Sequence, residues 1–245
     1  MASTTDADAS SPPPASACTI CNSPAKGCAR CKSAAYCSSE CQALDWSLHK
    51  ILYKEITRMP RPSPTHKLGI LFSPDWRNPD LVWVNFNNIK IPSVEKQFEL
   101  PDVDEFLTYG SEDSYDSEQL LIKPQWIMRA RNTKHTLAVY MQDNFGFDGS
   151  KMTQSASSIT AGMMKHAWKG PLIVVSMEGK SAPQSRTLRI GGVSLSVGTC
   201  VTFQRSIDIT LRDFRIVYDY FLAYPHESES NLTLKDQHGK TMIQS

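Results

Sequence analysis

The chain has 245 residues, of which 40% are hydrophobic and 21% charged, and its formal net charge is +1. These values indicate one ordinary globular domain or two small ones, and they exclude a fibre or a disordered acidic chain. The balanced charge also disfavours a general nucleic-acid binder, because such proteins carry many Lys and Arg that face phosphates. Six of the seven cysteines lie between Cys18 and Cys41, and we expect the function there.

Residues 1–17 are mostly Ser, Ala, Thr and Pro, a composition that predicts a disordered leader. They have neither the basic start nor the apolar stretch of a secretory signal, and apolar runs such as 172–175 are far too short to span a bilayer. We therefore expect an intracellular protein of the nucleus or cytoplasm that does not contact membranes. In a reducing compartment a dense cysteine cluster is expected to bind metal rather than to form disulfides.

Residues 18–58 are predicted to form a cysteine-rich module. Its candidate metal ligands are three cysteine pairs and one histidine: Cys18 and Cys21, Cys28 and Cys31, Cys37 and Cys41, and His49. A Cys-x-x-Cys turn supplies two thiolates to one tetrahedral zinc ion, and six thiolates are enough for more than one ion. A module of this size has too few apolar residues to fold on its core alone, so metal is expected to supply folding energy.

Two other cysteine-rich modules fit this spacing poorly. The fungal binuclear six-cysteine cluster needs a basic run after its second cysteine, and the segment 22–27 contains only Lys26. A RING-type module needs a long gap after its first pair. Within the module, Ser39 and Gln42 suggest one helix start and Asp45 suggests a second, so we expect two short helices.

Residues 35–50, AYCSSECQALDWSLHK, strongly resemble the MYND-type zinc finger, whose pattern YC-x-x-x-CQ-x-x-DW-x-x-H-x-x-x-C follows two Cys-x-x-Cys turns. The resemblance implies two zinc ions in a cross-brace. It assigns Cys18, Cys21, Cys37 and Cys41 to the first ion, and Cys28, Cys31 and His49 to the second.

The eighth ligand of the family pattern is a cysteine, and here its place is taken by Tyr53. A phenol with a pKa of about 10 is a poor zinc ligand at neutral pH. Water, the Tyr53 oxygen or an outside group such as His66 must complete the second site. We therefore predict that the second zinc ion is bound more weakly than the first and is lost first under mild chelation.

The resemblance also implies a groove that binds short proline-containing segments of partner proteins. Ser39, Gln42 and Trp46 occupy the implied groove positions; a core role for Trp46 is the alternative. From residue 18 to 53 there are four bases and two acids. Two zinc ions would add four positive charges and six thiolates would subtract six, so the loaded finger is about neutral. Such a finger favours a partner recognised by shape over DNA phosphates.

After a proline-rich linker at 59–65, residues 66–225 are predicted to form an α+β domain, followed by a flexible tail at 226–245. Strands are expected at 81–86, 136–141, 172–177, 186–190 and 193–197, and a capped helix is expected to begin at Thr210. This region resembles small fungal proteins with an N-terminal MYND finger. The resemblance rests on the segments 72–74, 79–84, 148–150, 168–171 and 213–215, and it implies no established chemistry.

We expect a non-enzymatic adaptor, with no small-molecule substrate, that acts in transcriptional regulation or in recruitment to a ubiquitin ligase. A regulator that contacts DNA and a lysine methyltransferase are the alternatives. A methyltransferase of this kind would need catalytic sequence before the finger, and only 17 residues precede Cys18. Cys200 with His135 or His166 is a conceivable thiol–imidazole pair, although a lone cysteine is more often a packing residue.

Overall fold

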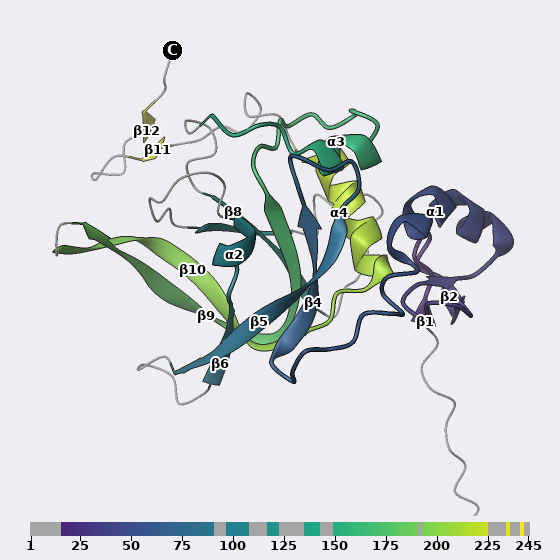
Figure 1. Ribbon diagram of the computed structural model, residues 1–245, viewed down its shortest axis with the longest axis horizontal. Coiled ribbons are helices and arrows are strands. Elements are labelled where there is room, and N and C mark those ends of the chain that lie inside the picture. The colour runs from purple at the N-terminus through teal and green to yellow at the C-terminus, as the bar shows by residue number, and fades with distance from the viewer. Residues whose placement is uncertain are drawn as a thin grey trace, which may run out of the picture.

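The computed structural model describes residues 16–90, 97–107, 117–122, 135–142, 149–190, 193–224, 234–235 and 241–242. They form an N-terminal finger and a larger, sheet-rich region, with helix α4 between the two (Figure 1). Residues 1–15 of the predicted leader and most of the predicted tail lie outside the described residues. In the described part, no helix is long and apolar enough to cross a membrane.

The finger consists of three short strands and one helix. Strands β1 (Ser16–Ala17), β2 (Pro24–Gly27) and β3 (Ala35–Tyr36) form an antiparallel sheet in the order β1-β2-β3. Helix α1 (Ser39–Leu52) begins at the N-cap Ser38, whose side chain accepts a hydrogen bond from the Cys41 N–H. The expectation of two short helices is therefore wrong. Asp45 does not start a second helix, because its side chain is buried within α1 and accepts a hydrogen bond from the Tyr36 hydroxyl.

The larger region is built around five strands that form a closed ring. These are β4 (His66–Phe72), β5 (Asp80–Lys90), β6 (Gln97–Pro101), β9 (Leu172–Ile190) and β10 (Val193–Ile207). Their order is β10-β6-β5-β4-β9, and β9 pairs again with β10 to close the barrel. Strands β8 (Thr136–Gln142) and β7 (Ser117–Leu121) extend the sheet beyond β9.

The closed barrel corrects the expectation of an α+β domain, since this region is sheet-rich with only a few helices. Strand β9 makes closure possible because it is 19 residues long. Its first residues pair with β4 and β8, and the rest pairs with β10. The other described elements are α2 (Asp104–Leu107), α3 (Gln154–Ile159), α4 (Leu211–Ala223), β11 (Leu234–Lys235) and β12 (Thr241–Met242).

The local predictions in this region are confirmed. Each expected strand lies within β5, β8, β9 or β10. Helix α4 starts with a capping box, in which the Thr210 side chain accepts a hydrogen bond from the Asp213 N–H and the Asp213 carboxylate accepts one from the Thr210 N–H. The apolar face of α4 is buried, with Phe214, Val217 and Phe221 fully inaccessible to solvent.

The finger and the barrel share one hydrophobic core. Tyr36, Leu48 and Leu52 of the finger belong to the same buried cluster as Phe214 and Val217 of α4. The start of α4 also holds the cysteine turns: the Leu211 N–H donates to the Ser33 hydroxyl at 2.8 Å, and the Arg212 guanidinium donates to Asn22 Oδ1 at 2.7 Å. The finger is therefore packed on α4, while the domain boundaries drawn from the sequence remain predictions.

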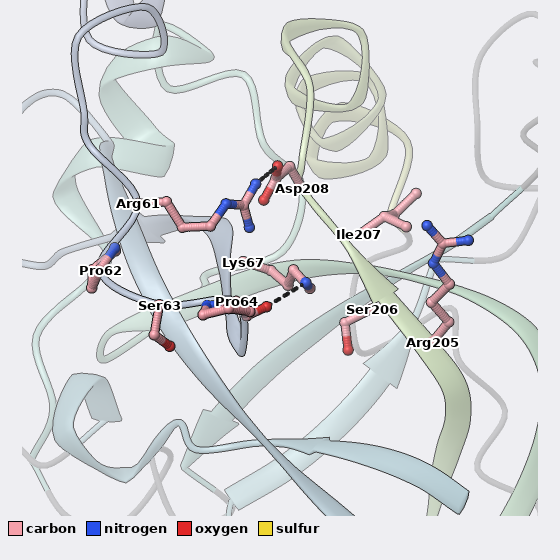
Figure 2. A pocket seen from close by; sticks show the side chains of 9 residues that line it. All are labelled: Arg61, Pro62, Ser63, Pro64, Lys67, Arg205, Ser206, Ile207 and Asp208. Atoms are coloured by element: carbon pink, nitrogen blue, oxygen red, sulfur yellow. Dashed lines mark hydrogen bonds and ion pairs between the residues drawn. The ribbon is translucent and has the colours of Figure 1, made fainter.

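The predicted linker also contacts the barrel. Figure 2 shows Arg61 paired with Asp208 at the end of β10, and the Lys67 ammonium donating to the Pro64 carbonyl. Asp208 in turn accepts a hydrogen bond from the Leu68 N–H of β4 at 3.0 Å. The Arg61 guanidinium also lies 5.0 Å from the Trp83 ring centroid. These contacts bind the linker to β4, β5 and the end of β10.

Candidate metal centre and interaction face

The structure brings the predicted ligands together in two groups. Within each group, the ligand atoms all lie within 4.8 Å of one another. The first group contains Cys18, Cys21, Cys37 and Cys41, and the second contains Cys28, Cys31 and His49. Successive cysteine pairs along the chain therefore belong alternately to the first and the second group. Strand β3 and the start of α1 bring Cys37 and Cys41 to the first group, and the end of α1 brings His49 to the second.

Two similar turns present the first two cysteine pairs. The Asn22 N–H donates to the Cys18 carbonyl at 3.0 Å, and the Lys32 N–H donates to the Cys28 carbonyl at 2.9 Å. Asn22 and Lys32 both have positive φ values, 67° and 53°, which non-glycine residues adopt mainly as single residues in tight turns. Each turn thereby directs two thiols to one side of the backbone.

The spacing of the donor atoms fits zinc. A tetrahedral ion with zinc–sulfur bonds of about 2.3 Å requires sulfur atoms about 3.8 Å apart. In the first group, Cys21 Sγ lies 3.3 Å from Cys37 Sγ and 4.0 Å from Cys41 Sγ. In the second group, His49 Nε2 lies 3.8 Å from Cys28 Sγ and 3.7 Å from Cys31 Sγ. A tetrahedral zinc ion requires a nitrogen–sulfur distance of about 3.6 Å between two of its ligands. Both groups can therefore each hold one ion of this size.

The protonation chemistry of the first group also suits a cation. Hydrogen bonds from Ser23 lower the pKa of the Cys21 thiol to about 6. The neighbouring thiols of Cys21 and Cys41 raise the pKa of Cys37 to about 12. Several thiolates this close together repel one another, and a divalent cation between them removes that repulsion.

His49 is oriented by a buried chain of hydrogen bonds. Burial lowers the pKa of His49, so the imidazole is neutral at neutral pH, as a metal ligand must be. The Tyr36 hydroxyl donates to Asp45 Oδ2 at 2.7 Å and lies 2.9 Å from His49 Nδ1. Because the Tyr36 proton points to Asp45, Nδ1 must carry the histidine proton. The lone pair is then on Nε2, which faces Cys28 and Cys31.

This chain continues into the barrel through Arg215 of α4. The Arg215 guanidinium lies 3.4 Å from Asp45 Oδ1 and donates to Asp219 Oδ1 at 3.0 Å. Asp45 and Asp219 are both buried. This connection could not be predicted from the sequence, where Asp45 suggested only a helix start. The motif contained Tyr36, Asp45 and His49, but nothing in it indicated an arginine 170 residues further along.

Tyr53 lies beside the second group and follows α1 as its C-cap. Its ring stacks on His49 with centroids 5.8 Å apart, and its hydroxyl accepts a hydrogen bond from Arg30 at 3.4 Å. His66 is not part of either ligand group. It starts β4, and its Nδ1 lies 2.7 Å from the Ser63 hydroxyl. Of the named candidates, only Tyr53 is therefore positioned beside the second group.

The predicted partner-binding residues lie on one face of α1. Ser39, Gln42 and Trp46 are spaced by three and four residues, as neighbours on a helix surface are. All three are exposed, and Trp46 retains 43% of its accessible surface. Trp46 is therefore not a core residue, although its ring contacts His49 and Tyr53. Their binding of a partner remains a prediction.

The conceivable thiol–imidazole pair stays a prediction, because it needs the Cys200 side chain. His135 pairs with Asp213 at 2.7 Å, and the His166 ring contacts Trp168 and Tyr224. Cys200 is on β10, but its side chain lies outside the described part.

Comparison with known proteins locates the resemblance in the finger. Residues 18–52 match the model of the MYND finger family. Neither the curated proteins nor the solved structures contain a match for the chain, so the resemblance of residues 66–225 to small fungal proteins stays a prediction. The matched segment spans all seven ligands of the two groups, so the family match and the ligand geometry together identify residues 18–52 as a MYND finger.

Proposed function

We propose that the finger, loaded with two zinc ions, binds an extended, proline-containing segment of a partner protein on the face formed by Ser39, Gln42 and Trp46. The exposure of Trp46 is the observation that carries this proposal. The buried side of α1, including Leu48 and Leu52, packs into the shared core, whereas the large apolar ring of Trp46 is open to solvent.

The chemistry of this face suits a proline-containing ligand. A proline-rich segment is already extended before binding, so it loses little conformational entropy when it docks on an aromatic surface. The indole ring of Trp46 offers a flat apolar platform for a proline ring. The exposed amide of Gln42, one helical turn away, offers a donor and an acceptor for the ligand backbone.

Zinc would keep this face in place rather than contact the ligand. Cys37 immediately precedes the N-cap of α1, Cys41 lies in the first turn and His49 lies near the end of the helix, so two ions would anchor both ends of the helix. The barrel would present the finger to the partner through α4. Transcriptional regulation and recruitment to a ubiquitin ligase are the cellular settings that we propose for such an adaptor.

A peptide array tests the proposal. We expect the full-length, zinc-loaded protein to capture peptides with a central proline, and we expect Trp46→Ala to abolish capture while the zinc content is unchanged. Leu44→Ala is the matched control, because Leu44 is 65% exposed and lines a different groove, with Leu48 and Tyr218. Proline-independent capture, or equal capture by wild type and Trp46→Ala, would refute the proposal.

The two alternatives make different predictions. A DNA-contacting regulator would bind duplex DNA with an affinity that falls steeply as salt increases. The near-neutral charge of the loaded finger favours the adaptor instead. A lysine methyltransferase would bind S-adenosylmethionine, and a thermal-shift measurement with that cofactor would detect this.

A further inference from the structure

The proposed binding face does not end at Trp46 but continues to the C-terminal end of α1. Tyr53 lies seven residues after Trp46, two helical turns along the same face, and the two ring centroids are 5.6 Å apart. At this position the family pattern has a metal-binding cysteine. In this chain the residue instead extends the aromatic surface of the finger.

A basic pocket of about 310 Å³ lies at this end of the surface. It is lined by Arg30, Tyr53, Lys54, Thr57 and Arg58. Arg30 and Lys54 each place their charge 5.9 Å from the centroid of the Tyr53 ring. The lining contains three cations and no acid, and among the described residues none of these cations forms an ion pair with a carboxylate.

We propose that this pocket receives a carboxylate side chain, Asp or Glu, of the same partner segment whose proline packs on Trp46. This inference rests on the proposed function and specifies the chemistry of the partner. The charge favours it: three exposed cations gathered around one pocket attract an acidic group and disfavour a basic one. The Tyr53 hydroxyl, which accepts from Arg30, adds a hydrogen-bond donor at the same place.

The geometry also sets the position of the acid. The Tyr53 ring centroid lies 5.6 Å from that of Trp46 and 5.9 Å from the charges of Arg30 and Lys54, so these cations lie up to about 12 Å from the Trp46 ring. An extended proline-type segment rises about 3.1 Å per residue. The acid should therefore lie three or four residues from the proline, whichever direction the segment runs.

The expected gain in affinity is moderate. Exposed ion pairs typically stabilise a complex by about 0.2–1 kcal/mol each, so three of them would strengthen binding by roughly tenfold at low salt. Because such pairs are screened over about 10 Å at 0.1 M ionic strength, the gain should shrink as salt is added. Packing of the proline on Trp46 should change much less.

Matched peptides test the inference. The best proline-containing peptide from the array is resynthesised with two Glu or two Gln placed three and four residues from its proline, on either side. Binding to the full-length, zinc-loaded protein is measured by fluorescence anisotropy. We expect the Glu peptide to bind about tenfold more tightly on one side of the proline. We also expect Lys54→Gln with Arg58→Gln to reduce that difference to about twofold, the share left to Arg30, without weakening the Gln peptide.

The control variant is Lys26→Gln with Lys32→Gln, which removes the same charge from the finger outside the pocket; it should keep the preference for Glu. If the Glu and Gln peptides bind wild type equally, the carboxylate site is refuted and the proposed function stands. If no proline-containing peptide binds at all, the proposed function fails and this inference fails with it. If the control variant reduces the preference as much, general charge attraction replaces the pocket as the explanation.

Discussion

Replacement of Arg215 by methionine tests whether the barrel helps to build the second metal site. The Arg215 guanidinium forms ion pairs with both Asp45 and Asp219, and these two residues retain only 1% and 2% of their accessible surface. Methionine keeps the length and packing of the side chain but removes the charge. The variant thus leaves two buried carboxylates without their cation.

The size of the effect follows from burial. Removing one partner of a buried ion pair typically destabilises a protein by about 3–5 kcal/mol, because the remaining charge stays buried and uncompensated. Asp45 would then lose its hold on the Tyr36 hydroxyl, and Tyr36 would no longer orient His49. Loss of an outer partner of a metal ligand commonly weakens metal binding by about 10–100-fold.

Two measurements check this prediction. Urea unfolding of the metal-loaded chain gives the free energy of unfolding, and competition with a chromophoric chelator gives the affinity of each metal ion. We expect Arg215→Met to lower both, with loss confined to one of the two ions. Arg205→Met is the matched control, since Arg205 is 71% exposed in its pair with Glu178 and should cost at most about 1 kcal/mol.

The double variant Asp45→Asn with Arg215→Met separates the ion pair from general damage. Asparagine at position 45 removes one of the two buried charges, so Arg215→Met should cost less in the Asp45→Asn background, and the remaining cost is the share of Asp219. Equal stability and equal metal affinity for wild type and Arg215→Met would refute the reasoning.

Three further predictions concern other parts of the molecule. Wild type should lose its metal ions in two steps under mild chelation, and Tyr53→Cys should bring the two steps together by supplying an eighth ligand; simultaneous loss from wild type would contradict this. Gly69→Ala should destabilise the barrel by about 1–3 kcal/mol in urea unfolding. An added Cβ there would lie 3.0 Å from the Val174 carbonyl oxygen, whereas Gly27→Ala meets nothing within 4 Å and serves as the control. Burial opposes protonation of His135, but its hydrogen bond to Asp213 raises its pKa overall. The contribution of protonated His135 to the free energy of unfolding should therefore be complete below about pH 6.5 and should fade as the pH rises through the raised pKa. The stability difference between wild type and His135→Gln should shrink accordingly between pH 6 and 8.5, and a growing difference would contradict the assignment.

Local chemistry explains which features could be predicted from the sequence. The ligand groups follow from short cysteine spacings, because a tight turn or one helical turn determines where both thiols point. The capping box of α4 is equally local, since Thr210 and Asp213 are three residues apart. Such features depend on few residues and need no knowledge of the rest of the chain.

The features that could not be predicted depend on distant contacts. Asp45 has a residue type that suits a helix start, but burial beside Tyr36 and Arg215 keeps it within one continuous helix. Closure of the barrel depends on pairing between β9 and both β4 and β10, and on the contact of Phe203 with Glu99 across β10 and β6. Strand patterns in the sequence show where strands lie but not which partners they choose.

A titration followed by nuclear magnetic resonance tests the central claim most directly. Isotope-labelled, zinc-loaded full-length protein is titrated with a captured proline-containing peptide. The account predicts that the signals of Gln42, the Trp46 indole and Tyr53 shift together, while those of Leu44 on another face of α1 remain unchanged. Shifts confined to the barrel, or no shift at the Trp46 indole when the peptide is bound, would contradict it.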